Sequence, residues 1–360
     1  MRQVFALFCG VFMVMALSNA IVPILPAFAE GSALQGAIYA AYFFGALVTV
    51  FPAGALSDRF GQRVFIQSGL FLTFVSGIMI LVAQSSPIVL AGRLLEGVAA
   101  GLFVPAGMSW MNSQKEHARL SGGFMAALNL GLLAGLFGTG WIDRLTGSDL
   151  VTLGIWVFTI LSLVPLLLSL HVQDVKSEKG GNGLLREEGW RYLWLYVSVT
   201  ILLGATGVVS SLYPEFSGGA PSLLSLQIGL MHTATMITVY ASSQIQLQPV
   251  LTIRATGLLM AVSVLSCYLS PIGFLLVGAV AGVAINAQLA FLAETGASQG
   301  AVMGLFNVSS YAGMSLLPFI AGILVEYSGN NFLIAFVATS VLCLFVAMTI
   351  GRCSCRLKGS

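Results

Sequence analysis

Two residues of opposite charge, Arg93 and Glu96, stand inside a long apolar run and are the first candidates for chemistry. A spacing of three places both side chains on one face of a helix. If that helix spans a membrane and starts near Pro87, Arg93 lies roughly 9 Å and Glu96 roughly 13 Å below its end. Ionisable groups at such depth are costly and mark ion or proton pathways by default. We predict that both face a central cavity and that Glu96 carries a proton; a purely structural ion pair is the alternative.

Several uncharged polar residues in other apolar runs could line the same cavity. Each of them could equally serve as a hydrogen-bond partner between helices. A histidine can change its charge near neutral pH, but a lone one is more often structural. The candidates are Asn19, Asn129, His232, Asn286, Gln288, Asn307 and Tyr311.

The sequence contains few of the residue patterns that are typical of enzymes or metal sites. The sequence has no HExxH, no GxSxG and no cluster of acidic residues with histidines. Three of the five cysteines lie in apolar runs, where a thiol usually acts as a small hydrophobe. The other two, Cys353 and Cys355, form an isolated CxC pair in the basic tail. We therefore expect no enzyme activity, no metal and no cofactor, and no filter-like segment suggests a channel.

The composition identifies the medium in which these residues lie. Charged residues make up 8% of the 360, against about 25% in a soluble domain. Hydrophobic residues make up 58%, and mean hydropathy is +0.96. A lipid bilayer can surround such a chain, because a lipid-facing helix needs no polar face. A net charge of +2 implies no nucleic-acid partner. The fold class predicted is an all-α polytopic membrane protein.

Segments of about 20 apolar residues, the length that a spanning helix needs, occur twelve times. The first resembles a secretory signal, but its end recurs later in the chain, so we interpret it as a helix. The predicted spans are 3–28, 36–57, 63–84, 87–112, 121–142, 150–172, 191–213, 222–241, 249–269, 271–294, 299–325 and 330–351.

The positive charges orient these spans. With the N-terminus in the cytoplasm, all 15 Lys and Arg except Arg93 and Arg144 fall on the cytoplasmic side. The positive-inside rule therefore favours two cytoplasmic termini and an even number of spans. We expect a multi-pass protein of the plasma or inner membrane.

Three internal matches in the same order indicate a duplicated chain. NAIVPILPAF before residue 29 matches GVVSSLYPEF before residue 217, IQSGL (66–70) matches IRATGL, and GGFMAALNLGLLAG (122–135) matches GAVMGLFNVSSYAG (300–313). Six spans per repeat give both halves the same orientation, with substrate bound near the midplane between them. The predicted parts are a six-helix bundle (1–172), a cytoplasmic linker (173–190), a second six-helix bundle (191–351) and a cytoplasmic tail (352–360).

The short loop between the second and third spans contains Gly54, Asp58, Arg59, Gly61 and Arg63. This stretch resembles the loop motif GxLaDrxGrr of the major facilitator superfamily. Its glycines allow close helix approach and a tight turn.

The aspartate of this loop suggests a conformational latch. A helix N-terminus attracts a carboxylate, so Asp58 could hold the start of the eleventh span, near residues 297–301, when the cytoplasmic side is closed. The alternative is a basic loop that only sets topology.

Two further stretches strengthen the resemblance. Arg93-Leu-Leu-Glu96-Gly97 is similar to the superfamily's RxxqG motif. The glycines of the fifth span partly match the antiporter motif GxxxxxxxxGxxxGPxxGG, although Leu136 and Thr139 depart from it. A packing stripe of small residues is the alternative. These glycines are Gly122, Gly131, Gly135 and Gly140.

The resemblance implies twelve helices in two pseudo-symmetric bundles that transport a small molecule by alternating access. Proton-coupled export by a monomer in the lipid bilayer is our first hypothesis, with protons as the coupling ion. The alternative is an importer or uniporter of a small metabolite, in which Arg93 would bind an anionic group.

Overall fold

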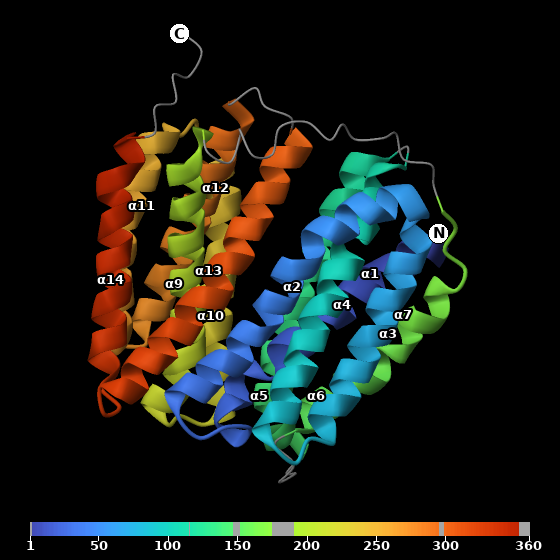
Figure 1. The fold of residues 1–360 in the computed structure, drawn as a ribbon, viewed down its shortest axis with the longest axis horizontal. Helices are drawn as coiled ribbons and strands as arrows, with labels where there is room; N and C mark the ends of the chain where they lie inside the picture. Colours follow the sequence, from blue (N-terminus) through green and yellow to red (C-terminus); the bar gives the residue numbers. More distant parts are fainter. Residues whose placement is uncertain (1, 115, 147–151, 175–190, 295–298, 353–360) are drawn as a thin grey trace. The chain divides into compact units, whose positions relative to one another are not determined.

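The computed structural model describes residues 2–114, 116–146, 152–174, 191–294 and 299–352, and these residues contain helices and no strand. The chain divides into two compact units (Figure 1). Unit 1 comprises Met1–Glu30, Ala37–Lys179 and Ser217–Leu226, and unit 2 comprises Gly31–Gly36, Gly180–Phe216 and Gln227–Ser360. Most of the predicted linker and of the predicted tail lies outside the described residues.

The first half of the chain forms seven α-helices and a 3₁₀ segment. They are α1 (Arg2–Ala20), η1 (Val22–Ala27), α2 (Ser32–Phe60), α3 (Gln62–Leu81), α4 (Ser86–Asn112), α5 (His117–Thr146), α6 (Leu153–Leu161) and α7 (Leu163–Ser169).

The second half forms six α-helices and a short 3₁₀ segment among the described residues. They are α9 (Leu193–Ser217), α10 (Pro221–Ser243), α11 (Pro249–Leu269), α12 (Ile272–Glu294), α13 (Gln299–Tyr327), α14 (Phe332–Thr349) and η2 (Ile350–Arg352).

Eleven of the described helices are long and apolar enough to cross a membrane. The twelfth predicted span, 150–172, contains the shorter pair α6 and α7. The two meet at Ser162 because Pro165 has no N–H to donate to the carbonyl four residues earlier. The prediction of an all-α polytopic membrane protein is confirmed.

The first predicted span is shorter than expected. The sequence suggested one helix over 3–28, whereas α1 ends at Ala20 and η1 follows it. Pro23 and Pro26 explain the difference, because proline removes a backbone donor and clashes with the preceding turn. Ile24, between them, leaves the helical region altogether.

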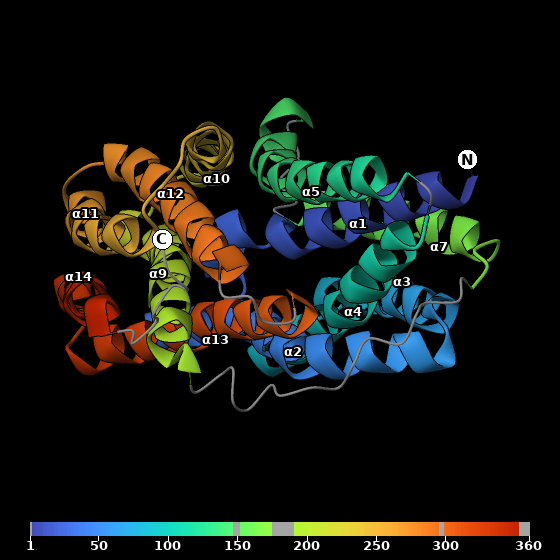
Figure 2. The ribbon, with the colours of Figure 1, turned by 90° about the horizontal axis from the view of Figure 1, so that it is seen from above.

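In unit 1 the backbones of α1 and α5 approach each other at glycines (Figure 2). A methyl group on Gly131 or Gly135 would overlap the carbonyl oxygens of Phe12 and Ala16, respectively. Nearby, Phe103 and Phe124 are fully buried, with ring centroids 6.2 Å apart. Small residues therefore set the helix spacing here, as expected where dispersion replaces a hydrophobic drive.

Unit 2 repeats this arrangement between α9 and α13. A methyl group on Gly313 would overlap the carbonyl oxygen of Thr200, and Gly204 in turn lies against Gly313. Gly135 and Gly313 are equivalent in the internal repeat, and they pack on α1 and α9, respectively. The repeat thus corresponds to one packing solution used twice.

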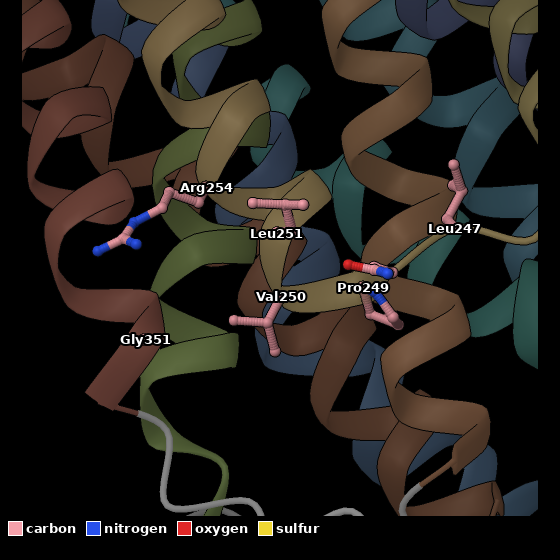
Figure 3. Close-up of a pocket in the computed structure, with 7 residues that line it drawn as sticks. Leu247, Pro249, Val250, Leu251, Arg254 and Gly351 are labelled. Atoms are coloured by element: carbon pink, nitrogen blue, oxygen red, sulfur yellow. The ribbon is translucent and has the colours of Figure 1, made fainter.

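Unit 2 also carries a surface pocket of about 530 Å³ where α11 begins and α14 has just ended (Figure 3). Its lining is mostly aliphatic and includes one charged side chain, Arg254. The lining residues are Leu247, Gln248, Pro249, Val250, Leu251, Arg254 and Gly351.

Candidate functional site

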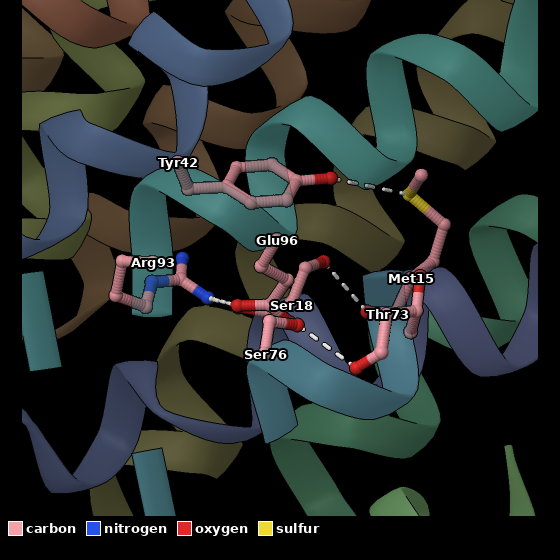
Figure 4. A network of polar contacts seen from close by, with 7 residues as sticks. All are labelled: Met15, Ser18, Tyr42, Thr73, Ser76, Arg93 and Glu96. Carbon is pink, nitrogen blue, oxygen red and sulfur yellow. Dashed lines mark hydrogen bonds and ion pairs between the residues drawn. The ribbon is translucent and has the colours of Figure 1, made fainter. Parts of the chain in front are cut away.

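Arg93 and Glu96 form a buried ion pair on α4, inside unit 1 (Figure 4). Their exposed fractions are 1% and 0%. Arg93 Nη1 donates to Glu96 Oε2, as the spacing of three residues allows. Two charges without access to water stabilise the native state only when their geometry and remaining hydrogen bonds are good.

Two neighbouring helices hold the guanidinium in place. Arg93 Nη1 also donates to the backbone carbonyl of Ser18 on α1, at 3.0 Å. The Arg93 Cζ lies 4.9 Å from the centre of the Tyr42 ring on α2, which is a cation–π distance. The Tyr42 hydroxyl lies 4.0 Å from the sulfur of Met15. Helix α3 packs on α4 next to Arg93, because a methyl group on Gly92 would lie 3.5 Å from the Ser76 carbonyl. Four helices therefore meet around one charge pair.

The pair is incompletely satisfied. Arg93 Nε and Glu96 Oε1 are buried and have no hydrogen-bond partner among the described residues. The hydroxyl of Ser76 cannot donate to Glu96 Oε1, because it uses its proton on the carbonyl of Thr73 on its own helix. A buried polar atom without a partner costs about 1–3 kcal/mol, more when charged. Unpartnered polar atoms of this kind are expected in a site that binds a proton or a polar ligand group during its working cycle.

Close contact between α2 and α4 positions the Tyr42 ring. A methyl group on Gly97 would overlap the Tyr42 carbonyl, and one on Gly45 would overlap the Leu94 carbonyl. Gly97 directly follows Glu96, so the contact lies at the charge pair itself. The glycine of the RxxqG-like stretch thus brings the aromatic ring within reach of the arginine.

The polar residues predicted in unit 1 do not reach this pair. Asn19 donates to the Leu132 carbonyl at 3.3 Å, between α1 and α5. Asn129 donates to the Met125 carbonyl of its own helix at 2.8 Å. Both are half-buried.

In unit 2 the predicted residues are spread over three helices. Asn286 of α12 donates to Ser242 of α10 at 3.1 Å. Gln288 donates to Ser198 of α9 at 3.2 Å and leaves a buried Oε1 without a partner. His232 and Tyr311 are half-buried, and Asn307 is exposed. Whether any of them lines a cavity stays a prediction.

The loop motif is held by a residue that the sequence analysis did not single out. Asp174 Oδ1 accepts from the Arg63 backbone N–H at 2.8 Å and so caps the start of α3. Gly61 has φ +95°, and a methyl group there would lie 2.6 Å from the same oxygen. Arg63 Nη2 also donates to the Leu170 carbonyl at 3.2 Å. The chain that leaves α7 therefore closes over this turn.

The latch itself lies beyond what is described. The side chains of Asp58 and Arg59 and residues 295–298 are outside the described part of the chain. Gly54 is half-buried. A methyl group added to Gly54 would lie 4.0 Å from the Pro105 side chain. The Asp58 latch stays a prediction.

The fifth-span glycines differ in their surroundings. Gly131 and Gly135 pack on α1, as described above, and Gly140 packs on Pro221 and Ser225 in the first turn of α10. An added methyl group on Gly122 would meet nothing within 4 Å. Packing explains three of the four glycines, and an antiporter role stays a prediction.

Tyr42 and Asp174 are the residues that sequence reasoning missed. The aromatic run Tyr-Phe-Phe at 42–44 resembles an ordinary apolar helix face, so nothing marked Tyr42. Asp174 belongs to a charged stretch that was interpreted as linker. Nothing in the neighbouring sequence marks it, because the helix that it caps begins more than a hundred residues earlier in the chain.

Relatives with curated descriptions match parts of the chain. The quinolone resistance protein NorA of Staphylococcus aureus is 24% identical over 145 residues, 39% of this chain and 36% of that protein. The probable chloroplastic anion transporter 6 of Arabidopsis thaliana is 30% identical over 124 residues, 33% of this chain and 24% of that protein. The matched stretches thus span little more than a third of these relatives at most.

Solved structures match over nearly the whole chain. The nucleoside transporter NupG gives a TM-score of 0.76 at 13% identity, over 98% of this chain and all of that one. A D-xylose–proton symporter gives 0.75 at 16% identity, over 100% and 98%. A bacterial homolog of the human lysosomal transporter Spinster gives 0.73 at 14% identity, over 98% and 96%. At these identities the likeness concerns the fold.

The family model with the description Major Facilitator Superfamily matches residues 7–318. This match covers most of the chain, and the twelve-span pattern, the internal repeat and the fold agree with it. The chain belongs to the Major Facilitator Superfamily, and it is a membrane transporter rather than an enzyme.

Proposed function

We propose that this transporter exports a small molecule in exchange for protons, and that Glu96 binds the proton. The observation that carries the proposal is the buried, incompletely satisfied Arg93–Glu96 pair on α4. The helix is of membrane-spanning length, and a charge pair so deep is a functional candidate by default.

The geometry suggests how the pair would work. With Glu96 ionised, the two charges neutralise each other. When Glu96 takes up a proton, the attraction is lost, but the Ser18 carbonyl and the Tyr42 ring still hold the guanidinium. Arg93 is then a fixed cation with a free Nε. The protonation state of one carboxyl would thus change the charge and polarity of the site without unfolding it.

Export is the direction we favour. The NorA match supports it, because that relative is named for quinolone resistance. The glycines of α5 support it through their partial likeness to the antiporter motif. Both arguments concern direction only, and the proton role of Glu96 is independent of them.

Transport by inside-out membrane vesicles tests the proposal. An acidic vesicle interior should drive accumulation of a fluorescent quinolone by the wild-type protein. Glu96→Gln keeps the shape and removes the titration, so it should abolish pH-driven accumulation and still permit exchange down a substrate gradient. Arg119→Gln is the matched control, since this arginine is exposed and its ion pair with Glu116 lies on the surface. Wild-type accumulation by Glu96→Gln would refute a proton role for this carboxyl.

A second function is the import or facilitated transport of an anionic metabolite. Two observations favour it: Arg93 keeps an unpaired Nε, and one relative is described as a probable anion transporter. In that case Arg93→Gln should abolish uptake of small carboxylates or phosphates into right-side-out vesicles. Glu96→Gln should then leave uptake dependent on the substrate gradient alone.

A further inference from the structure

One face of α11 combines an exposed aliphatic stripe with a single cation. Leu251, Leu258 and Val262 are 60%, 49% and 66% exposed and recur at helical spacing. Arg254 lies on the same face and is also exposed. It is the one charged residue of α11 and lies five residues after the helix start, so its depth is roughly 8 Å along the axis. An arginine can extend from that depth to a membrane–water interface.

The guanidinium of Arg254 is fixed and yet available. Arg254 Nε donates to the Ala347 carbonyl of α14 at 3.0 Å. The contact between the two helices is tight, because a methyl group on Gly257 would lie 3.0 Å from the Cys343 carbonyl. Gly351 has no side chain to fill the space beside Arg254 Nη2. A methyl group added to Gly351 would lie 3.9 Å from that nitrogen. The guanidinium is therefore held in one orientation at the Gly351 side of the pocket.

No carboxylate of the described residues neutralises this charge. The pocket lining contains no acidic residue, and residues 242–262 contain none either. The sequence after Gly351 contains Arg352, Arg356 and Lys358 and no acidic residue. The pocket is thus complementary to an anion supplied from outside the chain.

We propose that the pocket of Leu247–Leu251, Arg254 and Gly351 binds the headgroup of an anionic phospholipid. The Arg254 Nη groups would hold the phosphate, since a guanidinium donates to phosphate through two parallel bonds. An acyl chain would continue along Leu258 and Val262, on the stripe that α11 already exposes. A free phosphate would leave the aliphatic walls of the pocket uncovered, so the observations favour a lipid.

The distribution of cations supports this occupant. Juxtamembrane Lys and Arg attract anionic lipids by about 1 kcal/mol each, and basic pockets between helices bind lipid headgroups. The positive charges of the sequence place the start of α11 on the cytoplasmic side, where anionic lipids are found. The site is independent of the Arg93–Glu96 pair, which belongs to unit 1.

Thermal unfolding of the purified, delipidated protein in detergent tests the site. Short-chain phosphatidylglycerol should raise the unfolding temperature with a saturable dependence on concentration. Phosphatidylcholine of the same chain length and inorganic phosphate should not. Arg254→Gln should weaken the apparent affinity about fivefold, the factor for about 1 kcal/mol. Arg119→Gln should leave it unchanged.

A second variant separates ligand binding from stability. Gly351→Phe fills the pocket and leaves the bond from Arg254 to Ala347 intact, so a similar loss of affinity is expected even if Arg254→Gln folds poorly. Unchanged affinity in both variants would overturn the proposal. Equal stabilisation by phosphatidylcholine would also overturn it, and so would full stabilisation by inorganic phosphate, which would indicate a free-anion site.

Discussion

The guanidinium of Arg93 meets three different kinds of partner: a carboxylate, a backbone carbonyl and an aromatic face. Each partner comes from a different place in the chain, on α4, α1 and α2. A guanidinium can serve all three at once because it is planar and has five donors. A lysine ammonium is a compact point charge and could not contact all three partners at once.

Tyr42 provides a test at this scale. Tyr42→Leu removes the aromatic face, worth about 2 kcal/mol for a desolvated cation, and should slow pH-driven transport at least tenfold. Tyr42→Phe keeps the face and should restore most of the rate. The measurement is the initial rate of accumulation in vesicles over a range of pH. Tyr39→Leu is the matched control: both tyrosine rings pack on Phe43, at 5.1 Å and 5.0 Å, but the cation–π contact with Arg93 is made by Tyr42.

A rate for Tyr42→Phe as low as that for Tyr42→Leu would show that the hydroxyl group, rather than the ring, is required. A wild-type rate for Tyr42→Leu would show that the Tyr42 ring serves only to pack the helices. If Glu96→Gln also transports normally with pH, the fault lies with the proton proposal and not with Tyr42.

Sequence reasoning at the residue scale found charges and missed their partners. Arg93 and Glu96 stand out because any charge in an apolar run is costly. Tyr42 does not, because an aromatic residue is ordinary in a membrane helix. Its role depends on the approach of α2 to α4 at Gly97, and helix pairing is not encoded in local composition.

At the scale of helices, glycine positions determine how closely backbones approach. Gly97→Val should destabilise the protein by at least about 2 kcal/mol, because the new side chain would overlap the Tyr42 carbonyl. The unfolding temperature in detergent measures the effect. Gly122→Val is the matched control, with the same change of helix propensity and nothing within 4 Å of an added methyl group. Equal unfolding temperatures for the two variants would contradict this account.

Helix existence was predictable from the sequence, but helix ends were not always. The span predicted at 249–269 coincides with α11, because Pro249 and Gln248 mark a clear start. The first and sixth spans are apolar over most of their length, so hydropathy alone did not show that Pro23, Pro26 and Pro165 interrupt them. The composition of a segment indicates whether lipid or water surrounds it. A proline interrupts the helix itself, because it removes a backbone hydrogen-bond donor.

At the scale of the whole molecule, the internal repeat in the sequence has a structural counterpart. Gly135 and Gly313 occupy equivalent repeat positions, and they lie against α1 and α9, respectively. The repeat does not extend to the charge pair: Arg93 and Glu96 lie within α4, whereas the corresponding helix α12 carries Asn286 and Gln288 and has its one charged residue, Glu294, at its last position. A duplicated scaffold with chemistry in one copy is consistent with a single coupling carboxyl.

The bond from Asp174 to the Arg63 N–H also determines where this chain can be divided. A transporter made as two separate polypeptides keeps that bond only if the first one includes residue 174. Division between 180 and 185 should therefore give fragments that reassemble into a functional transporter when produced together. Division after Ser169 transfers the cap of α3 to the other fragment, together with the Leu170 carbonyl that Arg63 uses. Co-purification of the first fragment by a tag on the second should fall accordingly, and Asp174→Ala in the longer first fragment should reproduce part of that loss.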